Sequence, residues 1–561
     1  MILLTGMLLS SCSDWLDETL TSDVSASSYY TTPQGLEDAV KATYAEMKPF
    51  FGTEMGFTMT VFGTDMHTNG ADGSHKAINF YDGGLSPTEG FIRDTWSGFY
   101  RGINQANAVI NRSATIDMDP VLKEQRIAEV RFLRGLYYFI LTQFYGDIHF
   151  SLDETEGVEL TANKTSAEVI YSDAIIPDLE YAVSKLPDSQ GDYGRATKPA
   201  AEFLLAKVYM TRFYKSFGVA NDAVKAEELM TNVIDNYTFS LLPDFESLWE
   251  LGNEENSEII FSVQNSKQQV DEGTDGYGHR GHLYFLMEYD KMPGMTRDTD
   301  NGRPWKRFMP TDYLLGLYDN RANDSRYDKS YKHEWFSNSA DNIPVWTQAE
   351  ADAGYTTQAN VDQPKFNVGD VAIFIPGPGE DVNWDQAKQA ATPYMVITKD
   401  EYTQKLFPTL NKWIDPSRPN RQHTQGQRDF ILMRLADAYL IRAEARFQQT
   451  DTQGAADDIN VVRSRAAWLG DATALANMQI LAADVTLDRI LDERALELDG
   501  EGHRWFDLVR TNTLVDRVKL YNSDAAGNIQ PYHVVRPIPQ AQIDRTLGGY
   551  EQNCGYPGAG C

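Results

Sequence analysis

Residues 427–447 read QRDFILMRLADAYLIRAEARF, and this stretch decides the fold. Apolar side chains recur along it every three to four positions, which places them on one side of an α-helix of about five or six turns. These side chains are Ile431, Leu432, Leu435, Ala436, Tyr439, Leu440, Ala443 and Phe447. The pattern therefore predicts one long amphipathic helix.

A shorter copy of this pattern occurs earlier in the chain. Residues 205–210, LAKVYM, match residues 435–440, LADAYL, with the small Ala and the Tyr in register. A second predicted helix follows each copy, over 221–237 and 453–468, and a looser third copy lies at 127–145. Such pairs bury their apolar sides against neighbouring pairs. We predict a mainly α fold, with tetratricopeptide-like helical hairpins forming an α-α superhelical frame.

Helical periodicity is confined to two parts of the chain, 33–263 and 427–515. Between them, residues 264–423 are rich in Trp, Tyr, Asn, Pro and Gly, and only 311–318 has a helical pattern there. We interpret this stretch as a long loop-rich insertion. Little β-structure is expected anywhere.

The Gly-rich residues 51–90 form a second region without a regular helical pattern. Ordered loops of this length are usually functional. Since no change in composition marks a linker, we predict a single domain over 33–561 whose binding face comprises 51–90 and 264–423.

The N-terminus resembles a secretion signal of the lipoprotein type. An apolar run over residues 1–9 ends in Ser10, Ser11 and Cys12. The pattern predicts a signal segment over 1–12, acylation of Cys12, and a polar tether over 13–32. No Lys or Arg precedes the run, which indicates an internal start of a longer signal. The alternative is a hydrophobic tag with a chance cysteine. The chain would be held at a membrane by its lipid anchor only, because no other apolar span is present.

The other two cysteines, Cys554 and Cys561, are separated by a Gly- and Pro-rich segment that can turn the chain back. We predict a disulfide between them.

Charge excludes several classes of partner. The formal net charge is −31, whereas nucleic acids and anionic membrane surfaces require a basic face. One basic cluster comprises Arg297, Arg303, Lys306 and Arg307. We expect its members to pair with nearby acidic residues instead of binding phosphate. The sequence shows no metal-ligand spacing and no cofactor motif.

Glu493 and Glu497 are the carboxylates that would suggest a glycosidase, since they share one helix face. Arg494, Arg504 and Arg510 surround them in the sequence, and ion pairing lowers the pKa of a carboxyl, which is wrong for a general acid. We predict structural ion pairs and no enzymatic activity.

Sugar binding needs exposed aromatic faces beside hydrogen-bonding groups. Both kinds of side chain occur in the two loop regions. The predicted stacking residues are Tyr81, Trp305, Trp335 and Trp346, and their predicted hydrogen-bonding partners are Asp65, Asn79 and Arg303. The alternative for each Trp is that it fills the interior of a loop.

Several motifs resemble the SusD/RagB family of outer-membrane lipoproteins. The motifs are WSGFYRGIN at 96–104, RFLRGLY at 131–137, RLADAYLIRAEA at 434–445, ERALELDGEGHRWFDLVR at 493–510 and PIP at 537–539. They follow the family's order over nearly the whole chain. At Asp499 the family more often has an apolar or small residue.

The resemblance implies a non-enzymatic, surface-exposed glycan-binding protein. Such a protein would pass its ligand to a SusC-type TonB-dependent transporter, over which it forms a lid. The alternative is a structural lid, or a protein-binding helical-repeat adaptor, that binds no glycan.

Overall fold

The structure is a computed structural model that describes residues 31–155, 157–265 and 278–561. The predicted signal segment with Cys12, and residues 13–30 of the predicted tether, lie outside the described residues. Where the structure does describe the chain, none of its helices is long and apolar enough to span a membrane.

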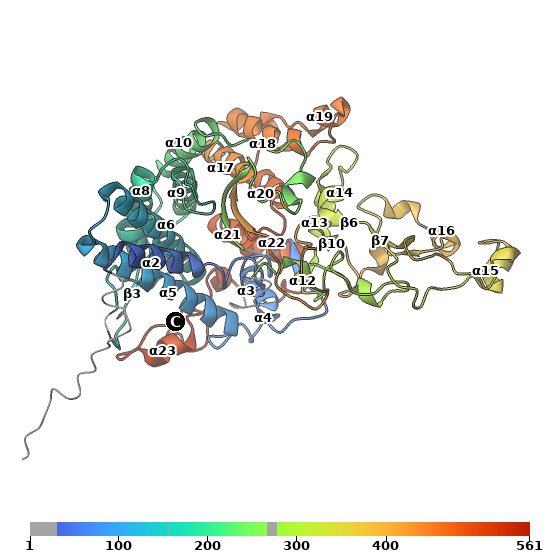
Figure 1. Ribbon diagram of the computed structural model, residues 1–561, viewed down its shortest axis with the longest axis horizontal. Coiled ribbons are helices and arrows are strands. Elements are labelled where there is room, and N and C mark those ends of the chain that lie inside the picture. The colour runs from blue at the N-terminus through green and yellow to red at the C-terminus, as the bar shows by residue number, and fades with distance from the viewer. Residues whose placement is uncertain (1–30, 156, 266–277) are drawn as a thin grey trace, which may run out of the picture.

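Long helices pack one against the next to form the frame, which Figure 1 shows as a curved array. In packing order they are α2 (Pro33–Ala45), α5 (Gly90–Arg112), α6 (Pro120–Tyr145), α8 (Ile176–Lys185), α9 (Lys198–Phe213), α10 (Asp222–Asp235), α17 (Leu435–Gln448) and α18 (Thr452–Ala466). The predicted helical-repeat frame is confirmed. The helices predicted at 127–145, 221–237 and 453–468 correspond to α6, α10 and α18.

The two sequence copies, α9–α10 and α17–α18, are neighbours in space. Helix α10 packs directly on α17, and Arg446 Nε donates to Glu227 Oε1 at 3.0 Å across this junction. The array is therefore interrupted in the sequence but continuous in the fold.

Close helix packing within the frame depends on Gly102. Helices α5 and α6 cross so closely that a Cβ on Gly102 would lie 2.5 Å from the Tyr137 ring. The Tyr137 hydroxyl then reaches α2 and donates to Thr43 O at 2.6 Å. Gly102 of α5 thus leaves room for Tyr137 of α6, and Tyr137 in turn links α6 to α2.

The prediction of a continuous helix over 427–447 is wrong in its first third. Residues Phe430–Arg434 form strand β11, and α17 begins only at Leu435. Strand β11 pairs antiparallel with β4 (Ile259–Val263), with Phe430 opposite Val263. Both strands are buried on both faces, and such strands have a continuous apolar sequence that periodicity cannot distinguish from a helix.

The other strands are short, and all except β2 and β3 lie in the loop regions. The pairs are β1 (His67–Asn69) with β5 (Phe308–Pro310), β2 (Ile148–His149) with β3 (Lys164–Thr165), β6 (Tyr331–Lys332) with β10 (Thr409–Leu410), and β8 (Val371–Phe374) between β7 (Glu334–Phe336) and β9 (Met395–Val396). The expectation of little β-structure is confirmed.

The loop regions also contain short helices. They are α3 (Glu54–Thr60), α4 (Ala77–Phe80), α7 (Ala167–Ile170), α12 (Gly281–Tyr284), α13 (Asp312–Leu317), α14 (Arg326–Ser330), α15 (Gln348–Asp352) and α16 (Gln386–Ala391). Helix α13 was predicted. Helix α3 was not, because its two turns depend on burial of Phe57 and Met59 rather than on a visible period.

The C-terminal part closes the fold. Its helices are α19 (Ala472–Met478), α20 (Leu487–Glu497), α21 (Arg504–Arg510), α22 (Leu514–Tyr521) and α23 (Gln540–Arg545). Cys554 and Cys561 form the predicted disulfide, with their Cα atoms 5.5 Å apart.

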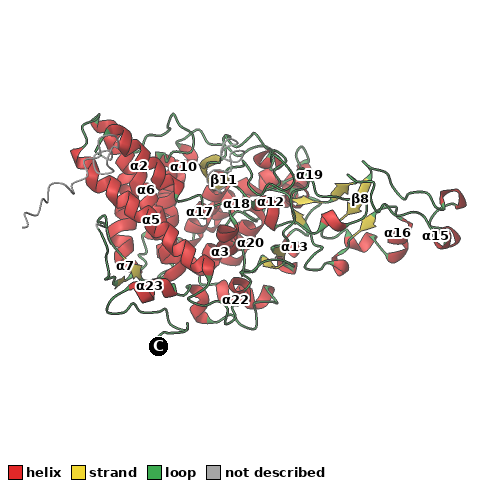
Figure 2. Ribbon diagram, turned by 60° about the horizontal axis from the view of Figure 1, so that its bottom comes forward, coloured by secondary structure: helices red, strands yellow, loops and turns green. Residues whose placement is uncertain are grey.

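Residues 334–402 form a part that we call the distal lobe. It contains β7, β8, β9, α15 and α16 and projects away from the frame in Figures 1 and 2. Trp335, Phe366 and Ile373 of the lobe are buried in an apolar cluster that is separate from the core of the frame and also includes residues of 286–295 and Ile414. The frame and the distal lobe therefore have distinct interiors.

Candidate functional site

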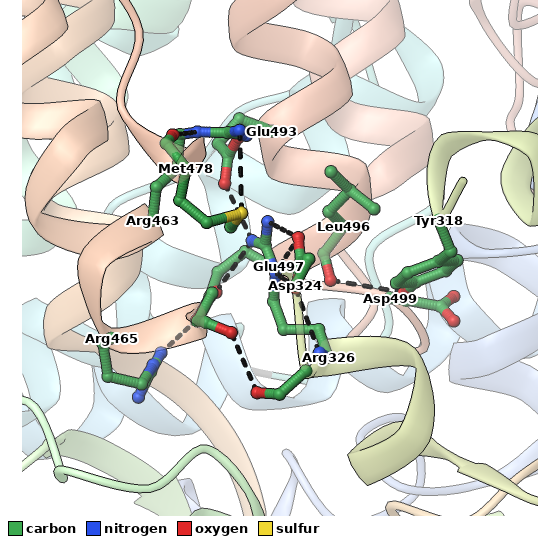
Figure 3. A network of polar contacts seen from close by, with 12 residues as sticks. Tyr318, Asp324, Arg326, Arg463, Arg465, Met478, Glu493, Leu496, Glu497 and Asp499 are labelled. Carbon is green, nitrogen blue, oxygen red and sulfur yellow. Dashed lines mark hydrogen bonds and ion pairs between the residues drawn. The ribbon is translucent and has the colours of Figure 1, made fainter. Parts of the chain in front are cut away.

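Residues 493–510, the strongest motif of the sequence, form α20 and α21 over a buried network of ion pairs, which Figure 3 shows in part. Arg434 Nη1 lies 2.7 Å from Glu497 Oε1, and Arg326 Nη1 lies 2.8 Å from Glu493 Oε1. All four side chains are at most 1% exposed. Neither carboxylate is accessible to a ligand.

Electrostatics around these carboxylates oppose acid catalysis. Burial raises the pKa of Glu497, but the charges of Arg465, Arg434 and a third guanidinium outweigh burial and hold this pKa below its ordinary value. The pKa of Glu493 is lowered in the same way. A glycosidase needs a carboxylic acid with a raised pKa. The ion-pair hypothesis for Glu493 and Glu497 is confirmed.

The partners expected from the local sequence were wrong. Arg494 pairs with Asp437 and Asp507, while Arg504 and Arg510 pair with other carboxylates. The carboxylates of α20 are instead neutralised from β11, α14 and α18, which are distant in the sequence. Sequence spacing along one helix cannot reveal such partners.

Asp65 and Asn79 lie in the interior, which contradicts their predicted contact with a glycan. Asp65 Oδ2 accepts hydrogen bonds from Arg504 Nη2 at 2.6 Å and from Arg517 Nε at 2.8 Å. Asn79 Oδ1 accepts one from the backbone N–H of Gly63 at 3.0 Å. Both side chains fix the 51–90 segment against the C-terminal helices and the neighbouring turn.

Tyr81 is also buried, contrary to its predicted stacking role. Its side chain is 2% exposed, and its hydroxyl donates to Gly63 O at 2.7 Å. Its ring lies 5.6 Å from the guanidinium carbon of Arg536, a cation–π contact inside the protein. No sugar ring can reach this face.

Two of the predicted tryptophans fill the interior of the distal lobe. Trp335 is 1% exposed and lies on β7 opposite Ile373 in the apolar cluster. Trp346 is 7% exposed, and Lys365 Nζ lies 4.5 Å from its ring centroid. These positions contradict a role as exposed stacking surfaces, since both indoles are buried inside the lobe and a sugar ring cannot reach them.

Trp305 and Arg303 remain accessible, and both are half-buried. Trp305 lies three residues before the start of β5 at Phe308, and its backbone N–H donates to Leu283 O at 2.7 Å. On the other side, the N–H of Gly70 donates to Arg307 O at 2.9 Å. The indole thus sits between α12 and the 51–90 segment, on backbone held from both sides.

This close approach requires glycine at position 70. A Cβ there would lie 2.1 Å from Lys306 O. The backbone N–H of Asp72 also donates to Lys306 O, at 3.2 Å. Because Lys306 follows Trp305 in the chain, this hydrogen bond holds the loop around Asp72 close to the tryptophan. A Gly-rich stretch of the sequence therefore positions one wall of the site.

Charged and aromatic groups surround the Trp305 ring. The guanidinium carbons of Arg303 and Arg307 lie 5.6 and 5.1 Å from its centroid, and the Tyr284 ring lies 6.0 Å away. Arg307 Nε donates to Glu54 Oε1 at 2.8 Å. We call Trp305, Arg303, Arg307 and Glu54, together with the buried Tyr284 beside the indole, the Trp305 site.

The basic cluster largely pairs as expected. Arg307 pairs with Glu54, Lys306 Nζ lies 3.1 Å from Asp72 Oδ2, and Arg297 Nη2 lies 2.7 Å from Asp290 Oδ2. Arg303 Nη1 donates to the carbonyl of Gln422 at 2.6 Å, and no carboxylate of the described residues pairs with it. Arg303 is therefore the cation of this cluster whose charge is left for a ligand.

The sequence missed three members of the Trp305 site. Arg307 was assigned only to the basic cluster, and Tyr284 was one of many loop tyrosines. Glu54 gave no signal, since it lies 253 residues from Arg307 in the chain. No group of three or more potential metal ligands is found among the described His, Cys, Asp and Glu side chains.

The arrangement suits recognition and not bond cleavage. An indole offers a flat apolar face, guanidinium N–H groups donate hydrogen bonds, and a carboxylate accepts them. A sugar presents the complement, an apolar ring face and an edge of hydroxyl groups. The Trp305 site thus contains the two kinds of contact that a saccharide requires.

Comparison with known proteins agrees with this chemistry. Residues 257–556, more than half of the chain, match the SusD family, and residues 14–210 match a family described as starch-binding and associating with the outer membrane. The chain is similar to SusD-like protein P25 of Formosa agariphila, with 26% identity over 96% of this chain and 97% of that protein. It is also similar to the starch-binding protein SusD of Bacteroides thetaiotaomicron, with 25% identity over 81% of this chain and 76% of that protein.

A solved laminarin-binding SusD-like protein shares the fold, with a TM-score of 0.67 and 22% identity over 94% of this chain and 100% of that one. The starch-binding SusD and the laminarin-binding protein are named as binding proteins and not as enzymes, and together with the family match this confirms the expectation of a non-enzymatic chain. The family match, the tetratricopeptide-like frame and the buried motif of α20 and α21 agree, and the chain belongs to the SusD family.

Proposed function

We propose that the chain is a cell-surface lipoprotein that captures oligosaccharide or polysaccharide and passes it to a SusC-type TonB-dependent transporter of the outer membrane. Family membership supports this proposal, as do the starch and laminarin named for two relatives and the outer-membrane association in one family description. The single structural observation that carries it is the partly exposed Trp305 side chain, with the guanidinium groups of Arg303 and Arg307 over its ring.

In this proposal the sugar ring stacks on the free part of the Trp305 face. Arg303 donates to its hydroxyl oxygens, and Glu54 or Asp72 accepts from its hydroxyl groups. Each contact is weak alone, and the rigid backbone pairing of β1 with β5 limits the entropy lost on binding. The ligand is held without being cleaved, in keeping with the relatives that are named as starch-binding and laminarin-binding proteins.

Native gel electrophoresis in polysaccharide-containing gels tests capture. The protein is run in gels cast with soluble starch, laminarin, or plant, fungal and host polysaccharides, beside an unrelated non-binding protein. We expect at least one polysaccharide to retard the protein strongly. Unretarded migration of well-folded protein across the whole panel would contradict glycan capture.

Acylation of Cys12 is tested separately. In a host that processes bacterial lipoproteins, the wild-type protein should incorporate labelled palmitate and fractionate with the outer membrane. The Cys12→Ala variant should do neither. Equal labelling of both proteins would contradict acylation at Cys12 and would have no bearing on the proposed glycan capture.

A second candidate function is a lid that binds no glycan. The burial of Tyr81, Trp335 and Trp346 favours it, because most of the predicted stacking residues are structural. A lid should copurify with the transporter encoded beside it, and Trp305→Ala should not alter that association. Glycan retardation of the wild-type protein would reject the lid that binds no glycan.

A further inference from the structure

The distal lobe contains an open groove that the Trp305 site does not include. Its volume is about 320 Å³, and it lies between β9 and the segment that surrounds α15. Pro293, Pro344, Phe366 and Tyr394 supply flat apolar walls. We call this the lobe groove.

Polar side chains lie along the same groove. Glu350 and Lys365 form an ion pair, with 2.5 Å between Glu350 Oε1 and Lys365 Nζ. Gln389 and Thr392, at the C-terminal end of α16, contribute amide and hydroxyl groups. The groove therefore combines flat apolar surfaces with hydrogen-bond donors and acceptors, some of them charged and some neutral.

Size and charge restrict the class of ligand. A volume of this order fits a small-molecule or oligosaccharide site, whereas a stable protein interface needs roughly 800 Å² on each partner. Lys365 and Glu350 neutralise each other, and the other charged group of the lining, Glu401, accepts hydrogen bonds from Thr398. The groove therefore presents no free cation that would select an acidic ligand. A neutral hexose chain, with apolar ring faces and hydroxyl edges, fits these walls.

The groove is also supported independently of the frame. Phe366 belongs to the buried cluster of the lobe, and Tyr394 packs against that cluster while remaining half-exposed. The ring of Tyr394 lies 6.4 Å from that of Phe374 on β8, which fixes its orientation. A ligand would therefore meet a preformed surface.

We propose that the lobe groove is a second carbohydrate-binding site for neutral hexose chains. The proposal rests on the glycan capture proposed above and adds that the favoured ligand is a long polymer. A polymer that reaches from the Trp305 site to the lobe groove would make the second contact intramolecular. An oligosaccharide too short to reach both would bind only one of them at a time.

Methionine NMR tests occupancy of the groove directly. Met395 of β9 lines it and is half-buried, so its methyl group reports on a ligand there. Protein with ¹³C-methyl-labelled methionine is titrated with maltohexaose and laminarihexaose, and the Met395 signal is assigned with Met395→Leu. We expect at least one hexaose to shift the Met395 signal. An unmoved signal with both hexaoses, and with soluble starch and laminarin, would overturn the proposal.

Polymer affinity then separates this proposal from the Trp305 site. Tyr394→Ala should weaken binding of whichever polymer the wild-type protein retains by about tenfold or more, while hexaose binding at the Trp305 site persists. Tyr355→Ala, which removes another half-exposed ring of the lobe outside the groove, is the matched control and should change neither.

Three outcomes can be distinguished. If Tyr394→Ala leaves polymer affinity unchanged while Trp305→Ala lowers it, the second site is rejected and capture at Trp305 stands. If Trp305→Ala retains polymer binding and Tyr394→Ala abolishes it, the groove stands and the Trp305 assignment fails. If the wild-type protein binds none of the four probes, the lobe groove proposal is rejected, and if it also binds no polysaccharide of the gel panel, glycan capture is rejected as well.

Discussion

The frame and the distal lobe are built on different interiors. The frame buries charge, since Arg434 is 1% exposed and its partner Glu497 is fully buried. The lobe buries aromatic and aliphatic side chains such as Trp335 and Ile373, all within residues 286–414. The frame thus depends on partners from distant segments, with Arg434 and Glu258 separated by 176 residues, whereas the apolar cluster of the lobe comes from one continuous stretch of the chain, residues 286–414.

This difference implies different consequences of mutation. A buried ion pair must be complete, because an uncompensated charge in the interior is costly. An apolar cluster loses stability in proportion to the volume removed and can relax locally. We therefore expect damage to the network to unfold the whole frame and damage to the lobe to remain in the lobe.

The largest expected effect is that of Glu497→Ala. It leaves Arg434, Arg465 and Arg326 with one carboxylate fewer, and the free energy of unfolding should fall by about 3–5 kcal/mol. Urea denaturation followed by circular dichroism measures this. The control Glu124→Ala removes an exposed pair with Lys185 and should cost less than about 1 kcal/mol. Equal losses for the two variants would contradict the role assigned to burial.

An effect of similar size, but confined to the distal lobe and not spread over the frame, is expected for Trp335→Ala. The cavity should cost the lobe about 3–5 kcal/mol, and amide hydrogen exchange should accelerate in β7, β8 and β9 while α6 and α17 stay protected. Phe336→Ala is the matched control, since the neighbouring Phe336 is 52% exposed. Exchange that accelerates equally in α17 would show that the lobe and the frame unfold as one unit.

A third test concerns a buried carboxyl of the frame that differs from the network. Asp429 on the chain before β11 accepts a hydrogen bond from the backbone N–H of Asn265 at 2.9 Å, and no ion pair is found for it in the described ranges. Burial raises its pKa from 3.8 to about 7. The folded state therefore binds an extra proton between about pH 4 and pH 7.

Since the folded-state pKa is raised, the contribution of Asp429 to stability becomes more favourable as the pH falls from 7 towards 4, and it opposes folding above pH 7. Asp429→Asn keeps the acceptor for Asn265 and removes the charge. It should stabilise the protein at pH 8 by about 1–3 kcal/mol and flatten the pH dependence between pH 5 and pH 8. The exposed control Asp516→Asn should do neither. An unchanged pH profile in Asp429→Asn would contradict the raised pKa.

The sequence predicted the frame better than the site. Helices α9, α10, α17 and α18 follow from a period of 3.6 residues, which a single chain displays openly. Strand β11 was missed because a strand buried on both faces has no period of its own.

The site was predicted only in part because the composition of a loop does not show which of its side chains are buried in the folded protein. Trp305 and Trp335 lie in the same loop-rich insertion and have similar neighbours in the sequence, yet one is half-exposed and the other is 1% exposed. Asp65 was chosen from a polar loop, but its partner Arg504 is 439 residues away and draws it inside. Only the three-dimensional pairing of distant segments separates ligand-binding side chains from structural ones.

The central claim is that an accessible indole at Trp305, and not the buried aromatic side chains, contacts sugar. Isothermal titration of the wild-type protein, Trp305→Ala and the control Trp468→Ala with the polysaccharide that retards the wild-type protein tests this claim. Trp468 is half-buried on the frame side, so the control removes an indole of similar exposure. We predict at least about tenfold weaker binding for Trp305→Ala, with its denaturation midpoint close to that of the wild type and with Trp468→Ala unchanged in affinity. Undiminished affinity in a folded Trp305→Ala protein would contradict the account.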